Sequence, residues 1–394
     1  MAFVPFVIFV PFVPSVDFVI FVPFVPSVDF VMFMKAAAIT PGKRDSLRIV
    51  DVESPRPGGG EVLVDVLEAG VCGTDEDLIS GAIGEAPEGS DFLIIGHENL
   101  GAVAAAGREV RSLREGDLVV ATVRRPCPGR CFACRNARPD MCLGDDYVER
   151  GISKAHGFMA ERYVESPDYL VKVPRELRKV AVLLEPLSIV EKGIMEAFKI
   201  QERTLWKPEK ALVAGAGPIG LLAALVLRDM GLETYAFATR DRQSIKARVA
   251  EASGAHYYNV KTIPFEQIAQ SHGPFGIIVE ATGSSEVAFR AIRLVDRDGI
   301  VCLTGMSPHK GTHQVCTDCV NMDLVINNKA VFGTSSSNRL HFERGIERMI
   351  SIEGKWPGLL ETMFTRRVGL EHAADDLRRD REDIKVVVEI GEAR

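Results

Sequence analysis

The sequence predicts an α/β protein in which a β-rich domain is joined to a doubly wound parallel sheet. One observation is the motif Gly215-Ala216-Gly217-Pro218-Ile219-Gly220, which follows a short apolar strand at 211–214 and opens an apolar helical run. In that context a GxGxxG pattern indicates a dinucleotide-binding fold. The second is that strand and helix patterns alternate after the motif as far as residue 305. Such alternation predicts a parallel sheet with right-handed crossovers.

Length and composition set the outer limits. The 394 residues are enough for two domains with cores of their own. A formal net charge of -7 gives no reason to expect nucleic acid or an anionic membrane as a partner. With 46% hydrophobic and 26% charged residues, the composition is typical of a soluble globular protein. Four of the eight cysteines crowd into residues 127–142, which favours metal binding in a reducing, cytoplasmic compartment over disulfides.

The first thirty-three residues differ from the rest, because FVIFVPFVPSVD stands at 6–17 and again at 18–29. This stretch has no lysine or arginine, so it lacks the basic start of a signal peptide. Its prolines and aspartates argue against a transmembrane helix. Translation of a short tandem DNA repeat explains it most simply, and Met34 opens a normal first strand. We therefore expect residues 1–33 not to be part of the working protein; the alternative is a hydrophobic interaction or membrane-association segment.

The part that follows Met34 predicts the β-rich domain. Residues 61–69 and 117–123 have strand-like patterns, as do 147–152 and 157–164. Loops between the first two carry VCGTDEDLISG and IIGHEN, which supply Cys72, Thr74, His97 and Glu98. A thiolate, an imidazole and a carboxylate are what zinc takes from a protein. The alternative is a buried free cysteine and an unrelated histidine.

An acidic residue, Glu185, stands in the apolar run LLEPLSIVEKGI. An unpaired buried charge is costly, so Glu185 needs a partner or a metal. We favour the metal, given Cys72 and His97; the alternative is a helix N-terminal carboxylate that faces solvent.

Residues 127–142 contain four cysteines with gaps of three, two and seven residues. Four thiolates in a loop can close a tetrahedral zinc site, and the metal would supply the folding energy of a lobe without a core. The sequence therefore predicts a structural zinc lobe formed by Cys127, Cys131, Cys134 and Cys142. By contrast, Cys316 and Cys319 have no second pair and are interpreted as incidental.

The nucleotide half favours NADP over NAD. The second strand ends in Ala238-Thr239-Arg240-Asp241-Arg242, without an acidic residue at its tip to bind the NAD ribose. Arg240 and Arg242 suit a 2′-phosphate, although Asp241 after a small register shift could bind the ribose instead. Thr282 and Gly305, at the ends of the patterns 275–283 and 299–305, complete the predicted cofactor contacts. After about residue 335 the alternation stops, and a helix at 341–352 and a strand at 384–390 are expected to rejoin the first domain.

These motifs together resemble the zinc-containing medium-chain alcohol dehydrogenases, over the whole chain from Met34. More narrowly, stretches such as TVRRPCPG, YVERGI, AHGFMAE, EPLSIVEK and NNKAVFGT resemble archaeal-type glucose dehydrogenases. The resemblance implies a GroES-like catalytic domain from 34–205 and 336–394 and a Rossmann domain from 206–335. It also implies that Cys72, His97 and Glu98 or Glu185 hold a catalytic zinc.

By the same resemblance, Thr74, Glu149 and Glu185 meet a sugar, together with Ser336, which stands where those enzymes carry Asn. The implied reaction is hydride transfer from C1 of an aldose, D-glucose first, to NADP, with NAD possible, giving an aldonolactone. The implied assembly is a homodimer or homotetramer. The alternatives are a polyol, secondary-alcohol or threonine dehydrogenase, and a non-catalytic NADPH-binding protein.

Overall fold

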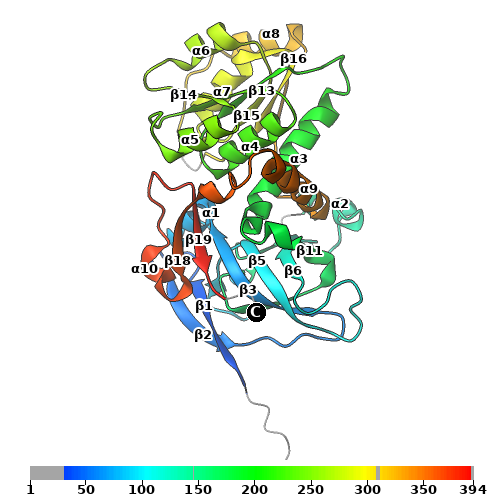
Figure 1. Cartoon of the computed structure of the whole chain (residues 1–394). Helices are drawn as coiled ribbons and strands as arrows, with labels where there is room; N and C mark the ends of the chain where they lie inside the picture. Colours follow the sequence, from blue (N-terminus) through cyan, green and yellow to red (C-terminus); the bar gives the residue numbers. More distant parts are fainter. Residues whose placement is uncertain (1–30, 145, 308–310, 392–394) are drawn as a thin grey trace, which may run out of the picture.

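The computed structural model describes residues 31–144, 146–307 and 311–391 (Figure 1). The first strand, β1 (Phe33–Ile39), begins one residue before Met34. The prediction about the repeat extension lies almost entirely outside the described residues. Within the described ranges, none of the helices combines the length and the apolar character needed to cross a bilayer.

The lower half of the molecule in Figure 1 is built on a seven-stranded sheet. Its order is β11-β6-β5-β3-β19-β18, with β10 also paired to β3. Because β19 runs antiparallel to β3, with Val386 opposite Val71, the C-terminal segment joins the first sheet as expected. The bounds are β3 (Val62–Val71), β5 (Glu98–Ala106), β6 (Leu118–Ala121), β10 (Arg162–Glu165), β11 (Leu170–Lys172), β18 (Phe364–Gly369) and β19 (Lys385–Glu389).

Two small sheets flank this one. The first has the order β2-β1-β4 and the second β7-β8-β9. The remaining bounds are β2 (Arg48–Glu53), β4 (Leu93–Ile94), β7 (Arg124–Arg125), β8 (Val148–Arg150) and β9 (Lys154–Ala155). The strand predicted at 157–164 is confirmed only in part, because β10 begins at Arg162 and before it Ala160 forms only an isolated bridge with Ala36.

The upper half is a six-stranded sheet in the order β14-β13-β12-β15-β16-β17, in which every pairing is parallel. This confirms the predicted α/β class. The strands are β12 (Lys210–Ala214), β13 (Glu233–Ala238), β14 (His256–Asn259), β15 (Phe275–Glu280), β16 (Val295–Leu303) and β17 (Ala330–Gly333). The helices are α4 (Pro218–Asp229), α5 (Ile245–Ala252), α6 (Phe265–His272), α7 (Ser285–Leu294) and α8 (Thr317–Ile326).

The alternating pattern did not predict α6, α8 or β17. Helix α8 buries none of its residues, so it has no apolar stripe that a sequence pattern could register. The structure also corrects the interpretation of Cys316 and Cys319 as incidental, because they form a disulfide at the start of α8.

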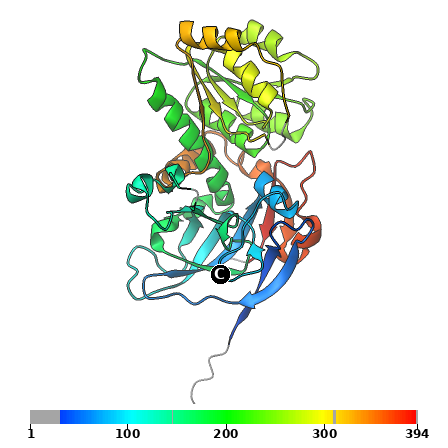
Figure 2. The same ribbon diagram turned by 180° about the vertical axis from the view of Figure 1, so that it is seen from behind.

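Two long helices, α3 (Leu184–Gln201) and α9 (Arg339–Lys355), lie side by side between the two sheets in both views (Figures 1 and 2). They approach closely at Gly345, where a Cβ would lie 2.7 Å from Leu184 Cδ1. Arg348 of α9 donates to Glu191 of α3 at 2.7 Å and also pairs with Asp229 at the end of α4. These contacts fix α3, whose first turn carries Glu185.

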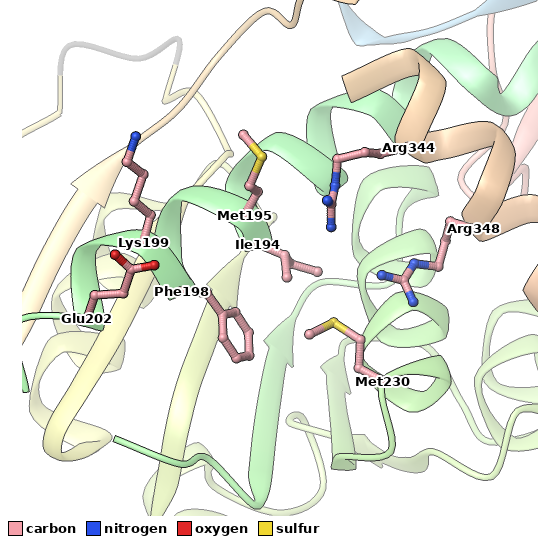
Figure 3. Close-up of a pocket in the computed structure, with 8 residues that line it drawn as sticks. All are labelled: Ile194, Met195, Phe198, Lys199, Glu202, Met230, Arg344 and Arg348. Carbon is pink, nitrogen blue, oxygen red and sulfur yellow. The ribbon is translucent and has the colours of Figure 1, made fainter. Parts of the chain in front are cut away.

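A hollow of about 410 Å³ lies along α3 and α9 (Figure 3). Arg344 and Arg348 of α9 face the apolar side chains of Phe198 and Met230 across it. None of its lining residues is one of the predicted ligands or cofactor contacts.

Candidate active site

The structure brings together the ends of two segments that carry Cys72 and His97. Cys72 follows β3 and caps α1 (Gly73–Ile79), where its Sγ accepts from Thr74 N at 3.2 Å. His97 immediately precedes β5, and its Nε2 lies 3.0 Å from Cys72 Sγ. The approach depends on Gly96, whose φ is +88° and where a Cβ would lie 2.4 Å from Met159 Cγ. The predicted pair is therefore a real constellation and not two unrelated side chains.

A carboxylate that the sequence analysis missed, Asp75, completes the far side of His97. Asp75 is fully buried, its Oδ2 accepts from Cys72 N at 2.9 Å, and its Oδ1 lies 3.8 Å from His97 Nδ1. Neither Asp75 Oδ1 nor His97 Nδ1 has a hydrogen-bond partner among the described residues. A histidine that binds a metal through one nitrogen usually turns the other toward a carboxylate. The available signal was the capping-box spacing, with an acidic residue three positions after Cys72.

The pKa values of several side chains in this cluster are raised. Burial by itself would lower the pKa of His97, but Cys72 and Asp75 raise it well above its ordinary value. Burial, helped by the charge of Glu98, raises the pKa of Glu185 to about 7. Burial likewise raises the pKa of Asp75. Several acidic groups and a thiol that share one buried space are typical of a site made for a cation.

Glu98 and Glu185 differ in how their charges are compensated. Both oxygens of Glu98 lie 2.6 Å from Lys385 Nζ, and both side chains are only 1% exposed. Lys385 also donates to Val71 O at 3.2 Å. Within the described part of the chain, no hydrogen bond or ion pair reaches the carboxylate of Glu185. The structure thus leaves Glu185 the less engaged of the two carboxylates that the sequence analysis left open.

The ligand types fit zinc. One candidate ligand atom from each of Cys72, Asp75 and His97 lies within 4.8 Å of the others, and the same holds for His97, Glu98 and Glu185. Sulfur, imidazole nitrogen and carboxylate oxygen are all donor types that zinc binds, and a catalytic zinc takes three protein ligands and keeps one position open. The orphaned His97 Nδ1 beside Asp75 is what such a site requires behind its histidine.

The four-cysteine lobe has the dimensions of a closed zinc site. Cys127 Sγ lies 3.8 Å from Cys134 Sγ, and Cys131 Sγ lies 3.8 Å from Cys142 Sγ. Sulfurs about 2.3 Å from a central tetrahedral zinc lie about 3.8 Å from one another. All four cysteines are free thiols, so disulfides do not account for the grouping.

The predicted dinucleotide motif has the expected geometry. Gly215 has a φ of +111°, and a Cβ at Gly220 would lie 2.1 Å from Gly215 O, so both positions need glycine. Gly217 is the N-cap of α4, with Pro218 at its first turn and Ile219 next. A Cβ at Gly217 would meet no atom within 4 Å, which leaves open space in front of the helix N-terminus. A pyrophosphate fits there, because the N–H groups of a helix start attract anions.

The other predicted cofactor residues lie at the ends of neighbouring strands. Thr282 follows β15, and its N donates to Glu280 Oε1 at 2.7 Å. Gly305 follows β16 and packs against Gly283, because a Cβ added at Gly305 would lie 2.3 Å from Gly283 N. This is the carboxyl edge of the parallel sheet, where such folds bind their ligands.

The two arginines after β13 have different surroundings. Arg240 is 26% exposed and lies against the 381–382 segment, with Nε 3.3 Å from Glu382 Oε1. Lys246, which the sequence analysis missed, donates to Arg381 O, as Arg240 does. Burial lowers the pKa of Lys246, and the charge of Arg240 lowers it further. Arg242 is 75% exposed and pairs with Glu251. Arg240 and Lys246 therefore lie close enough for the charge of Arg240 to lower the pKa of Lys246.

The remaining predicted contacts are partly engaged. Asp241 Oδ1 accepts from Asn259 Nδ2 at 3.0 Å. Glu149, on β8, pairs through Oε1 with Arg124 at 2.8 Å and not with the adjacent Arg150. Among the described residues, no hydrogen bond or ion pair reaches its other carboxylate oxygen. The Ser336 hydroxyl is buried and has no hydrogen-bond partner among the described residues.

Comparisons with known proteins bear on this arrangement. Residues 58–175 match the alcohol dehydrogenase GroES-like domain, and residues 178–390 match the glucose dehydrogenase C-terminus. The chain is 70% identical over 358 residues to a glucose 1-dehydrogenase of Methanocella arvoryzae, covering 91% of this chain and 100% of that one. It is 41% identical over 358 residues to a glucose 1-dehydrogenase of Thermoproteus tenax, with 91% and 99% covered.

A solved structure of a glucose dehydrogenase has the same fold as this chain. The glucose dehydrogenase of Haloferax mediterranei in complex with NADP, Zn and gluconolactone superposes with a TM-score of 0.84 at 33% identity. The match covers 91% of this chain and 100% of that one.

Proposed function

The chain belongs to the glucose dehydrogenase family, and from this premise we propose that it oxidises C1 of an aldose, D-glucose first, with NADP. The chain joins a GroES-like alcohol dehydrogenase domain to a glucose dehydrogenase C-terminal domain. The balance is simple: the carbinol carbon loses a hydride to the nicotinamide and its hydroxyl loses a proton, which leaves a lactone and NADPH. The observation that carries the proposal is that His97 belongs to two groups of possible ligands: its Nε2 lies 3.0 Å from Cys72 Sγ, and its ring also lies within 4.8 Å of the buried carboxylates of Glu98 and Glu185.

Cys72, His97 and Glu185 would hold a catalytic zinc, and Glu98 would support it from beside Lys385. Bound there, zinc supplies Lewis-acid stabilisation of the negative charge that develops on the substrate oxygen. Asp75 orients His97 from behind, because its Oδ1 faces the otherwise unpartnered Nδ1. The four-cysteine lobe would hold a second zinc with a purely structural role.

Thr74 is proposed to take part in removing the hydroxyl proton. It sits on the first turn of α1, two residues after Cys72, with its backbone N bonded to the Cys72 sulfur. A hydroxyl can accept one proton while it donates another, so it can relay a proton toward solvent. Glu149, Glu185 and Ser336 are the polar side chains proposed to receive the other sugar hydroxyls.

NADP is proposed to lie along the carboxyl edge of the parallel sheet. The open space beside Gly217 would receive the pyrophosphate, and Thr282 and Gly305 would border the nicotinamide end. Arg240, with Lys246 beside it, would bind the 2′-phosphate. Arg242, on the surface, would contribute mainly through its charge.

Arg240→Ala is expected to raise the KM for NADP about ten- to hundredfold while changing the KM for NAD little. The reason is that a charge-assisted contact to a phosphate contributes about 1.5–3 kcal/mol. Steady-state kinetics with both cofactors measure it. Arg242→Ala is the matched control and should have a smaller effect, since its guanidinium is mostly solvated and already paired with Glu251. Equal weakening of both cofactors by Arg240→Ala would contradict the assignment.

The substrate proposal is tested with a panel of aldoses, polyols, ethanol, a secondary alcohol and threonine. We expect D-glucose, or a close aldose such as D-galactose or D-xylose, to react at C1 much faster than simple alcohols. A site built to bond hydroxyls rejects analogues that lack them, because its polar groups are left unpaired. If threonine or a secondary alcohol exceeds every aldose, the zinc dehydrogenase proposal stands and the aldose proposal fails.

Glu149→Ala is expected to lower kcat/KM for the sugar by about tenfold or more and to leave the KM for NADP unchanged. A carboxylate can accept bonds from two neighbouring sugar hydroxyls, and a hydrogen bond to a charged group contributes about 1.5–3 kcal/mol. Since Arg124 already pairs with Glu149, Arg124→Gln is the control for simple loss of that ion pair. If Arg124→Gln and Glu149→Ala lower kcat/KM equally, the carboxylate acts only by holding the arginine.

A further inference from the structure

A buried ion pair joins the four-cysteine lobe to α3. Asp140 lies on η1 (Pro139–Met141), two residues before Cys142, and its side chain is fully buried. Its Oδ2 lies 3.1 Å from the Nζ of Lys192, which is itself only 2% exposed. Arg138, also in the lobe, donates to the same carboxylate from Nη2 to Oδ2 at 3.0 Å and from Nε to Oδ1 at 3.1 Å.

Both partners of this pair also reach the loop between β17 and α9. Lys192 Nζ donates to Ser335 O at 3.0 Å. Asn338 Nδ2 donates to Asp140 Oδ1 at 2.8 Å, while Asn338 Oδ1 caps α9 by accepting from Leu340 N. The loop of residues 335–337 is therefore held at each end by a group that belongs to one charged cluster.

The loop between those two anchors has a conformation that needs support. Ser336 has a φ of 55°, in the left-handed region that a side chain disfavours. Its hydroxyl is buried and has no hydrogen-bond partner among the described residues. The next residue, Ser337, lies 2.7 Å from Ser188 Oγ, and Ser188 donates to Glu185 O at 2.5 Å. The loop thus also contacts the helix turn that carries Glu185.

We propose that Asp140, Lys192 and Asn338 are positioning residues, which hold the 335–337 loop so that the Ser336 hydroxyl is kept in place for the substrate beside the Glu185 turn. The proposal rests on the proposed function, because only that function gives Ser336 a sugar to contact. The proposal also gives the four-cysteine lobe a second role, because the lobe carries Asp140, whose carboxylate contacts both Lys192 and Asn338.

The charged character of the cluster supports this role. A buried ion pair is often no more stabilising than a well-packed apolar pair, so simple attachment of the lobe does not call for one. Lys192 fixes the position of the loop relative to the lobe, because its ammonium group contacts both the carboxylate of Asp140 and the carbonyl of Ser335. An apolar side chain would pack against both without fixing the backbone of Ser335.

The experiment compares Lys192→Met and Asn338→Ser with the control Arg138→Met. Serine retains an N-cap for α9 but loses the amide bond to Asp140. Arg138 contacts Asp140 and Glu196 but no residue of the loop. We expect both test variants to raise the KM for the sugar about tenfold, with kcat and the KM for NADP within about twofold of wild type, as loss of substrate binding alone predicts. Arg138→Met should leave the KM for the sugar within about twofold.

Thermal unfolding and zinc content are measured on the same samples. A merely structural role would lower stability without a selective change in the KM for the sugar, and that result overturns the proposal. Asn338→Ser decides the matter if Lys192→Met does not fold, and an unchanged KM in Asn338→Ser overturns it as well. If wild type oxidises no aldose, the proposed function fails by itself. The same comparison with the alcohol that wild type does oxidise then still tests the loop.

Discussion

His97→Ala is expected to lower kcat with the best aldose about a thousandfold or more. The variant removes the imidazole whose Nε2 lies 3.0 Å from Cys72 Sγ, and with it a neutral donor of the proposed zinc site. A Lewis acid contributes several kcal/mol of charge stabilisation to such a reaction, and each ~1.4 kcal/mol is a factor of ten in rate. The KM for NADP should change little, because the proposed cofactor contacts come from the parallel sheet.

Zinc content provides the second measurement. Wild type should carry about two zinc ions per subunit, one for the catalytic set and one for the four-cysteine lobe. His97→Ala should carry about one, whereas His256→Ala, an exposed histidine on β14, should keep both and retain full activity. An active His97→Ala enzyme with unchanged zinc would show that His97 is not a ligand.

Lys385→Met is expected to lower the free energy of unfolding by about 3–5 kcal/mol, because it leaves the carboxylate of Glu98 buried and unpaired. Lys385 is fully buried and bonds both Glu98 oxygens at 2.6 Å. No solvent is available to replace it, so the cost is that of an isolated buried charge. Urea unfolding of wild type and variant, loaded with the same amount of zinc, measures the difference.

The double variant Glu98→Leu/Lys385→Met separates a broken ion pair from lost packing. It removes both charges at once, and a buried ion pair replaced by apolar groups is often neutral in stability. We expect it to recover most of the stability that Lys385→Met loses, although its activity will be impaired because Glu98 lies in the proposed active site. If the double variant is as unstable as Lys385→Met, the loss comes from packing around the lysine stem and not from the stranded carboxylate.

Residues that are close in sequence carried the predictions whose expected geometry the structure shows. The glycines of residues 215–220 follow one strand and open one helix, so local geometry alone requires them, and the parallel sheet follows from the alternation after them. The four-cysteine spacing brings thiols within one short lobe, where little chain has to be ordered before they meet. Cys72 and its capping-box partner Asp75 are also close in sequence, although the sequence analysis did not single out Asp75.

Contacts between distant residues were decided by the tertiary structure. Lys385 meets Glu98 only because β19 adds to the sheet beside β3, at whose other edge β5 starts with Glu98. That pairing engages Glu98, whereas Glu185 makes no ion pair among the described residues, and no local pattern carries this distinction. Likewise Asp140 and Asn338 are 198 positions apart, and Lys192 reaches Ser335 across 143. A buried charge is tolerated only where a partner arrives to pair it, and the packing of α3, α9 and the lobe determines which partner arrives.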